Sequence, residues 1–198
     1  MTHTDSKHFQ HQQPKLGKRA HELQPFGEVM KRLRIGLSDD VRSHSIDELN
    51  QILADSMMLR DLYKKHHWQV SGITFYELHL LFDKHYEEQV GLVDALAERI
   101  QILGGVSVAV PHDVAEMTRI LRPPKGREEV PVQLSRLLEA HETVLIQARA
   151  ASAKAAERGD DGTSDLLVSG VIRTHEQQVW FLSEHLINEP LTEAAELN

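Results

Sequence analysis

Four side chains that can bind a metal ion stand on one predicted helix. His79 and Asp83 form one pair and Asp94 and Glu98 form another, and the members of each pair are four residues apart. On an α-helix this spacing puts both members of a pair on the same face, one turn apart. Imidazole and carboxylate are ligands for iron, zinc and similar divalent cations. Each pair is therefore a candidate half of a metal site, and the alternative is an ordinary solvated helix face.

The length of the helix separates the two pairs. The 15 residues from His79 to Asp94 span about 22 Å and drift by only about 60° around the axis. Metal–ligand bonds are about 2 Å long, so the two pairs of one chain cannot hold the same ion. Two antiparallel copies related by a two-fold axis near residues 88–89 would bring each pair opposite the other. Gly91 would then allow the backbones to approach closely, although a glycine that is merely tolerated there is the simpler interpretation.

This helix is expected to run from Phe75 to Leu103. A capping box formed by Thr74 and Glu77 predicts its start, and Gly104 predicts its end. Its apolar positions centre on a different face from the ligand pairs, so we expect the ligands to point away from the core of their own bundle. The apolar positions are Leu78, Leu81, Phe82, Leu92, Val93, Leu96, Ile100 and Leu103.

Three further long helices are expected from apolar residues at helical spacing, at residues 39–69, 128–157 and 163–188. The connection 104–126 is too long for a tight turn, and a short helix is expected within it at 112–117. Four long helices with a long crossover between the second and third predict an all-α, ferritin-like four-helix bundle. No histidine has a glutamate three residues before it, so the di-iron motif typical of bundle interiors is not expected.

Composition limits the class of protein. The chain has 198 residues, 40% hydrophobic and 26% charged, with 13 histidines and no cysteine. These values predict one globular domain with no disulfide and no thiolate metal site. No apolar run approaches the length of a membrane span and the N-terminus lacks a signal peptide, so we expect a soluble, cytoplasmic protein without a membrane partner.

Charge divides the chain into three parts. Residues 1–37 carry seven basic and three acidic side chains, a net +4, whereas the whole chain carries −8, which leaves −12 for the remainder. We expect 1–37 to be a flexible, basic, histidine-containing tail, 38–189 to be the bundle, and 190–198 to be a short acidic tail. The basic tail is a candidate for contacts with DNA phosphates or for weak metal binding, and the alternative is a plain solubilising extension.

Residues 64–105 resemble the Dps family of mini-ferritins. They contain KKHHWQVSGITFYELHLLFD followed by DALAERIQILGG, and the resemblance extends over residues 38–189. It implies a shell of twelve subunits built from two-fold dimers, which oxidises Fe(II), preferably with H2O2, and stores the Fe(III) mineral. It also implies a role in protection against oxidative stress, association with the nucleoid where DNA is bound, and iron as the bound metal.

The resemblance assigns the ferroxidase centre residue by residue. His67, immediately before a tryptophan, matches the ligand on the first helix. His79 and Asp83 match the ligands on the second helix of the same subunit. Asp94 and Glu98 match the ligands contributed by the two-fold neighbour.

Further residues carry two interpretations each. Trp68 would lie beside the centre, either to intercept radicals or as a packed interface aromatic. Asp160, Asp161 and Asp165 resemble the acids that line the family's iron-entry pores, but acids at a helix start are also ordinary capping residues.

His175 departs from the family pattern because it falls on the apolar face of the fourth helix. It is either a hydrogen-bonded core histidine or an extra ligand of the centre. In the second case the centre would be richer in nitrogen and would favour zinc more strongly. Two other functions are therefore kept beside the ferroxidase: a DNA-compacting protein with little oxidase activity, and a zinc-binding shell that turns over iron slowly.

Overall fold

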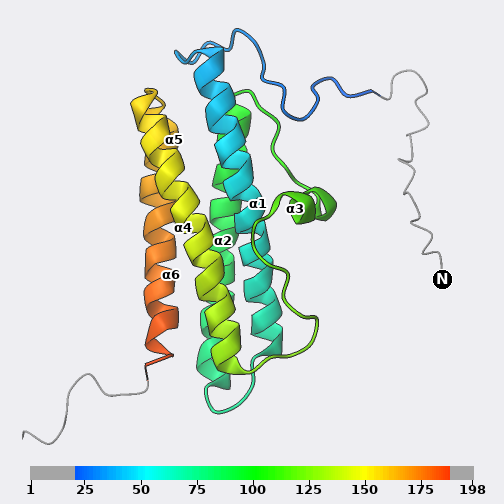
Figure 1. Ribbon diagram of the computed structural model, residues 1–198, viewed down its shortest axis with the longest axis vertical. Helices are drawn as coiled ribbons and strands as arrows, with labels where there is room; N and C mark the ends of the chain where they lie inside the picture. Colours follow the sequence, from blue (N-terminus) through cyan, green and yellow to red (C-terminus); the bar gives the residue numbers. More distant parts are fainter. Residues whose placement is uncertain (1–20, 188–198) are drawn as a thin grey trace, which may run out of the picture.

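Four helical rods form the bundle in the computed structural model, which describes residues 21–187 (Figure 1). α1 and α2 are an antiparallel pair, and α4 runs beside them with the fourth rod, which is made of three consecutive segments. No strand occurs in residues 21–187. The elements are α1 Asp39–Gln69, α2 Phe75–Ile102, α3 Pro111–Met117, α4 Val130–Glu157, α5 Asp161–Asp165, η2 Leu166–Ile172 and α6 Arg173–Glu184.

The turn between α1 and α2 positions His67 and His79. Gly72 adopts a φ of +99°, which only glycine takes without strain, and its carbonyl accepts from the Phe75 N–H at 3.1 Å. The capping box expected at Thr74 is wrong, because the Thr74 side chain makes no capping hydrogen bond. A tight turn closed by the glycine carbonyl starts α2 instead.

The far end of the same helix pair is fastened by Arg42. This fully buried guanidinium donates to the carbonyl of Leu103 at 2.6 Å and to that of Met30 at 2.8 Å, and it pairs with Asp39 at 2.6 Å. Gly104 follows α2 with a φ of +82°, as expected for a helix end. Arg42 therefore satisfies one carbonyl group at the end of α2, that of Leu103, and anchors the chain that precedes α1 through Met30.

The fourth rod differs from the single α-helix expected at residues 163–188. Residues 166–172 form a π-helix between α5 and α6, and α6 ends at Glu184. A π-turn holds more residues per turn than an α-turn, so it rotates the residues that follow it relative to those that precede it. Residue 188 and the acidic tail 190–198 lie outside the described residues, as do residues 1–20 of the basic tail.

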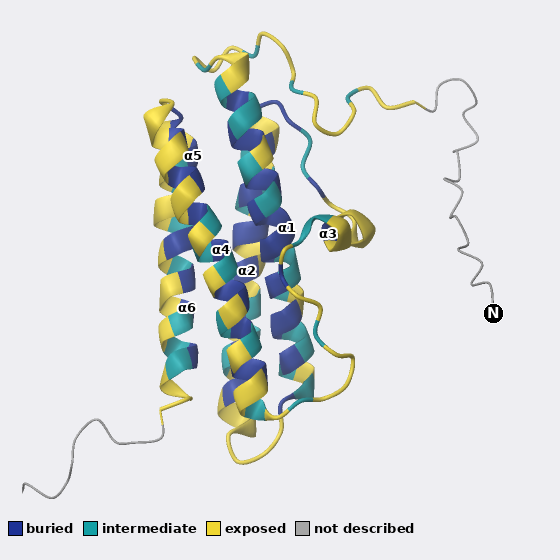
Figure 2. Ribbon diagram, in the orientation of Figure 1, coloured by how far each residue is buried: buried dark blue, intermediate teal, exposed yellow. Residues whose placement is uncertain are grey.

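The core lies between the four rods, where the buried faces meet (Figure 2). The apolar face predicted for α2 is confirmed: seven of its eight positions are buried and only Leu81 is half-buried. The crossover carries α3 along the outside of the bundle (Figure 1). Within residues 21–187 no helix is both long and apolar enough to cross a bilayer.

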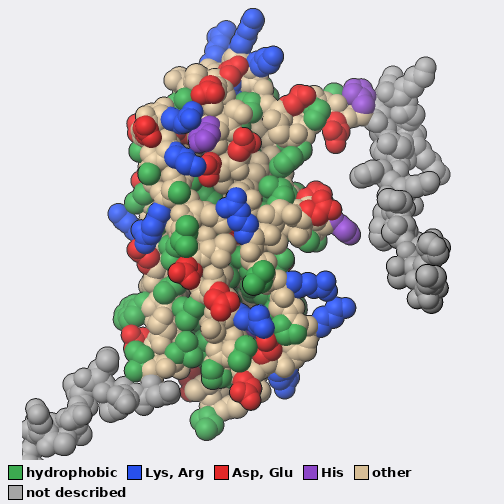
Figure 3. Space-filling view, viewed as in Figure 1, with side chains coloured by type: hydrophobic (Ala, Val, Ile, Leu, Met, Phe, Trp, Pro, Cys, Tyr) green, Lys and Arg blue, Asp and Glu red, His purple; other side chains and the backbone are tan. Residues whose placement is uncertain are grey.

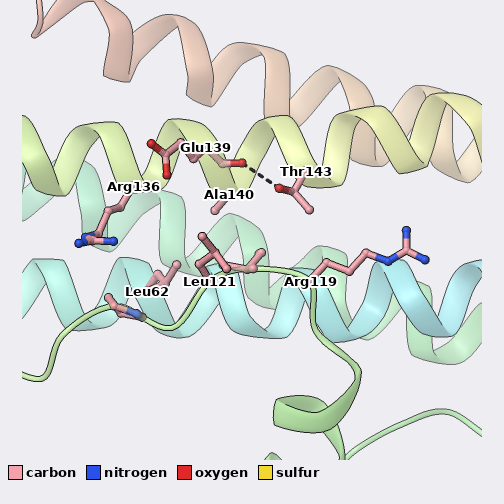
Figure 4. A pocket seen from close by; sticks show the side chains of 9 residues that line it. Leu62, Arg119, Leu121, Arg136, Glu139, Ala140 and Thr143 are labelled. Carbon is pink, nitrogen blue, oxygen red and sulfur yellow. Dashed lines mark hydrogen bonds between the residues drawn. The ribbon is translucent and has the colours of Figure 1, made fainter.

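A pocket lies beneath the crossover, between α1 and α4 (Figure 4). Leu62, Leu121 and Ala140 supply its apolar lining, and Arg136 stands at its edge. Both guanidinium contacts of Arg136 are made to the carboxylate of Glu128 at 2.7 Å. None of the predicted metal ligands lines this pocket, so the candidate site lies elsewhere.

Candidate metal centre

Two histidines bridge the end of α1 and the start of α2. The Nδ1 of His67 lies 2.8 Å from the carbonyl oxygen of His79, and the Nδ1 of His79 lies 2.9 Å from the carbonyl oxygen of His67. The two rings are stacked, with centroids 3.7 Å apart. The carbonyl of His67 is available because it belongs to the last turn of α1, whose carbonyls lack partners within the helix.

These reciprocal bonds fix the tautomer of both rings. A carbonyl oxygen can only accept, so Nδ1 must carry the hydrogen in His67 and in His79. A neutral imidazole then presents a lone pair at Nε2, which is the nitrogen that can bind a metal ion. Histidine ligands in metal sites commonly donate their other ring nitrogen to a carbonyl in this way. Both rings are therefore oriented as ligands by the backbone itself.

Asp83 supplies an oxygen next to the two rings. Its Oδ1 lies 3.9 Å from the Nδ1 of His67 and 2.5 Å from the Nζ of Lys64. The hydrogen bond from Lys64 is the main cause that lowers the pKa of the Asp83 carboxyl, so this group is ionised at neutral pH. We call His67, His79 and Asp83 the α1–α2 half-site.

Asp94 and Glu98 occupy the same outer side of α2, about four turns further along. Both are exposed, whereas Leu92, Val93 and Leu96 beside them are buried. The predicted outward direction of this stripe is confirmed.

The two carboxylates form the acidic half-site, and the two half-sites do not meet within one chain. In the described part of the chain no three His, Asp or Glu side chains converge closely enough to hold a metal ion. Gly91 lies between the half-sites, and a Cβ added there would meet nothing within 4 Å in its own subunit. The packing of the single chain therefore gives no reason for a glycine at this position.

Large apolar side chains surround the α1–α2 half-site on the surface. Trp68 is 71% exposed and Tyr76 67%, and Leu80 and Phe75 are also exposed. The ring of Phe75 lies 5.1 Å from that of His79. Exposed apolar residues grouped in this way are typical of surfaces that are covered by another protein. The environment of Trp68 is compatible with an interface aromatic, the second of its two interpretations.

His175 is not brought together with the five residues of the predicted centre. Its side chain is fully buried in the bundle interior, where Nδ1 lies 3.0 Å from Nδ1 of His141 and Nε2 lies 3.1 Å from the amide of Gln89. Burial lowers the pKa of His175 to about 3, so the ring is neutral. Its position corresponds to the hydrogen-bonded core histidine, the first of the two interpretations. His66 is likewise buried, away from the outer face.

The three acids proposed for a pore separate into two kinds. Asp160 is buried and caps α5 by accepting from the Thr163 N–H, and it also bonds to Ser45 at 2.7 Å and Arg99 at 2.5 Å. Burial alone would raise the pKa of Asp160, but these hydrogen bonds and the nearby Arg99 charge lower it. The capping interpretation therefore holds for Asp160, while Asp161 and Asp165 are exposed and remain pore candidates.

Two features near the site were not identified from the sequence. One is Lys64, which pairs with Asp83 and also lies 4.1 Å from the ring centroid of Tyr86. The other is a chain of hydrogen bonds through the interior, to which Tyr63 and His141 belong. The sequence did contain a signal for the interior hydrogen bonds, because Tyr63 and His141 are polar residues on the apolar faces of their helices.

Comparison with known proteins agrees with the fold. The family model of the ferritin-like domain matches residues 46–191. DpsC from Streptomyces coelicolor superposes with a TM-score of 0.84 and 54% identity, covering 87% of this chain and all of that one. An uncharacterised protein of the bpoA2 5′ region of Kitasatospora aureofaciens is 53% identical over 148 residues, which are 75% of this chain and 98% of that protein.

A more distant structure connects the fold with metal chemistry. The Dps protein of Vibrio cholerae O1 superposes with a TM-score of 0.75 and 28% identity over 81% of this chain and 99% of that one. It is described as a member of a broad superfamily of ferritin-like diiron-carboxylate proteins. The fold and these matches define a ferritin-like protein. Within that class the chain belongs to the Dps family of mini-ferritins.

Proposed function

We propose that this protein is a ferroxidase that oxidises Fe(II), preferably with H2O2, and stores the Fe(III) mineral inside a shell of twelve subunits. The α1–α2 half-site of one subunit and the acidic half-site of its two-fold neighbour would together bind the iron. The protein would thereby protect the cytoplasm against oxidative stress. Asp161 and Asp165 would attract iron ions toward the shell.

One observation carries this proposal: the reciprocal hydrogen bonds between His67 and His79. They engage Nδ1 of both rings with backbone carbonyls and so leave the two Nε2 atoms for a metal ion, and Asp83 adds a carboxylate beside the rings. A polar surface selected only for solubility would not require two rings with fixed tautomers. Because iron binds nitrogen and oxygen ligands together, this donor set suits Fe(II).

The residues of the chain have separate tasks in the reaction. His67 and His79 bind as neutral donors, and the carboxylates of Asp83, Asp94 and Glu98 offset the positive charge of the bound iron. Bringing carboxylates to an interface is unfavourable unless a cation accompanies them. The surrounding aromatic residues, Trp68 among them, limit the access of water.

Stopped-flow absorbance after mixing Fe(II) with the protein tests the proposal. We expect faster Fe(III) formation with H2O2 than with O2, and a loss of both reactions when Zn(II) is added first. Slow oxidation with either oxidant, together with tight Zn(II) binding, would favour the zinc-binding shell instead. Anaerobic melting provides a second readout, because a metal ion at the interface should raise the melting temperature by mass action.

DNA compaction is kept as a second candidate because of one structural feature. Lys31, Arg32 and Arg34 are all exposed on the turn that precedes α1, and basic side chains gather there at the top of the molecule (Figure 3). Met30 is held beneath this turn by a hydrogen bond from its N–H to the carbonyl of Gly104 at 2.8 Å. In a shell, twelve such turns together with residues 1–20 would act jointly on one DNA molecule.

A gel-shift assay at low and at moderate salt separates the two candidates. DNA binding through phosphates should weaken steeply as salt rises. We expect removal of residues 1–20 to weaken the shift and additional replacement of the three basic residues of the turn by glutamine to abolish it. Unchanged iron oxidation in both variants would show that the two activities are separate.

A further inference from the structure

A continuous chain of hydrogen bonds crosses the bundle interior, apart from the outer metal ligands. It joins all four rods and ends at a tyrosine between two imidazoles. Tyr63 is fully buried, and its Oη lies 2.5 Å from Nε2 of His141 and 3.1 Å from Nδ1 of His85. The interior chain consists of Glu88, Gln178, Gln89, His175, His141, Tyr63 and His85.

The first half of the interior chain is oriented from the carboxylate inward. Burial would raise the pKa of Glu88, but hydrogen bonds from Lys84 and Gln178 lower it, so Glu88 is ionised and can only accept. The Nε2 of Gln178 therefore donates to Glu88 at 2.8 Å, which turns its Oε1 toward Gln89. The amide nitrogen of Gln89 donates to that oxygen at 2.9 Å and to Nε2 of His175 at 3.1 Å.

The second half of the interior chain follows from the tautomer that the hydrogen bond from Gln89 imposes on His175. Because Nε2 of His175 accepts, its hydrogen is on Nδ1 and is donated to Nδ1 of His141 at 3.0 Å. The hydrogen of His141 is then on Nε2, and it is donated to Oη of Tyr63. The hydroxyl hydrogen of Tyr63 is left to point at Nδ1 of His85. The surface carboxylate thus fixes the direction of every hydrogen bond as far as the tyrosine.

We propose that Tyr63 is a one-electron donor in the bundle interior, which reduces a peroxide-derived radical formed at the iron centre and passes its phenolic proton to Nδ1 of His85. This inference rests on the proposed ferroxidase function for its oxidant. The neighbouring Trp68 is exposed, whereas a radical on Tyr63 would be shielded from solvent on all sides.

The interior supplies what such a donor needs. Burial and the Glu88 charge raise the pKa of Tyr63 well above its usual value, so a phenolate does not form and the proton must leave with the electron. The Nδ1 of His85 lies 3.1 Å from the phenolic oxygen, and the two rings meet edge-on with centroids 5.2 Å apart, so a proton acceptor is already in place. The Nε2 of His85 has no hydrogen-bond partner in the described part of the chain.

Tyr63 is close to the α1–α2 half-site. It precedes His67 by one turn of α1, about 6 Å along the axis. Its ring centroid lies 6.1 Å from that of Phe82, whose neighbour in sequence is Asp83. An electron therefore has a short path through packed side chains from the phenol to the iron ligands.

One reaction cycle consumes two Fe(II) ions and one H2O2. One Fe(II) reduces H2O2 to hydroxide and a hydroxyl radical, and becomes Fe(III). Tyr63 gives one electron to that radical, which becomes hydroxide, while the phenolic proton moves to His85 and leaves a neutral tyrosyl radical. A second Fe(II) then returns an electron to Tyr63, and His85 returns the proton. Two Fe(II) and one H2O2 thus yield two Fe(III) and two hydroxide ions, with no hydroxyl radical released.

The experiment freezes the protein milliseconds after mixing H2O2 with no more than one Fe(II) per centre, and records the EPR spectrum. The chain has only three tyrosines, so Tyr76→Phe and Tyr86→Phe are matched controls for Tyr63→Phe. We expect a tyrosyl radical in the wild type and in both controls, and none in Tyr63→Phe. The yield of spin-trapped hydroxyl radical should rise several-fold in that variant alone.

A second variant and an iron-free measurement keep the test decisive. His85→Leu retains the phenol but removes the proton acceptor, so it should lower the radical yield several-fold without changing Fe(II) affinity. In metal-free protein, azide radicals made by pulse radiolysis should oxidise the exposed tryptophans first, and the radical should then move to Tyr63. If the wild type oxidises no Fe(II), the ferroxidase proposal fails, but the pulse-radiolysis measurement on metal-free protein still decides the role of Tyr63. Equal tryptophan-radical lifetimes in wild type and Tyr63→Phe would overturn the inference.

Discussion

The molecule carries two groups of histidines with opposite environments. His67 and His79 lie on the outer face at the α1–α2 turn, with their Nδ1 atoms bonded to backbone carbonyls. His141 and His175 lie in the bundle interior, and their rings bond to each other and to neutral side chains. The outer rings are held by the backbone and leave a ring nitrogen for a ligand, whereas both nitrogens of the inner rings are used.

The difference shows that the type of residue does not define a metal site. His141 and His175 lie within hydrogen-bond distance of each other in the interior, yet both nitrogens of each ring are already bonded and burial keeps the two rings neutral. The outer group is incomplete in one subunit and borders exposed aromatic residues. An incomplete set of ligands that borders an apolar surface is expected to be completed by a partner subunit, whereas histidines whose two ring nitrogens are already bonded in the core have none left for a metal ion.

The largest expected effect comes from removing one half-site of the outer centre at a time. A variant with His79→Ala and Asp83→Ala, and another with Asp94→Ala and Glu98→Ala, should each oxidise Fe(II) at least on the order of a hundredfold more slowly, since changes to groups behind the ligands alone can cause such a loss. Dimers mixed from both variants should recover one intact centre of two. Stopped-flow rates on unfolded and co-refolded mixtures measure this, and no recovery would contradict the inter-subunit centre.

Acidification should lower the stability of the fold through the two inner histidines, His141 and His175. The pKa of His175 is lowered by burial from 6.5 to about 3, and that of His141 is also well below 6.5. The unfolded chain therefore binds protons that the folded chain does not, and the free energy of unfolding should fall as pH drops below about 6.5. Above that pH both states are neutral and the contribution is constant. Melting temperatures between pH 7.5 and 5 test this, and His175→Leu should have a shallower slope than the wild type.

His175→Leu also tests whether the inner histidines and the outer metal centre are independent of each other. His175→Leu leaves Nδ1 of His141 without a partner and leaves the Gln89 amide nitrogen only its hydrogen bond to Gln178. Each unsatisfied hydrogen-bonding position should cost about 1–3 kcal/mol of unfolding free energy. Denaturant unfolding measures the loss. Iron oxidation at two Fe(II) per centre should stay within about twofold of wild type, on the expectation that a residue outside the centre leaves the rate nearly unchanged. A collapse of iron binding would instead make His175 a ligand.

The smallest expected effect concerns Lys64, which neutralises Asp83 on the outer face. A cation at the centre has to compete with this ammonium group, so Lys64→Met should raise the affinity for Fe(II) or Zn(II). The ion pair is partly exposed, which limits the gain to about two- to fivefold. Calorimetric titration with Zn(II) measures it, with Lys65→Met as the control, because Lys65 bonds to Gln69 instead. Equal affinities in both variants would show that Lys64 does not compete.

The sequence by itself determined the rods and the outward stripe, because both depend on the local period of the α-helix. The spacing of four residues on α2 was enough to place two half-sites about 22 Å apart, and the range 39–69 expected for the first helix matches α1. Only the tertiary structure decided what depends on long-range contacts. The His67–His79 bonds and the interior hydrogen bonds arise where different helices meet, and no local pattern encodes which polar atoms will face one another there.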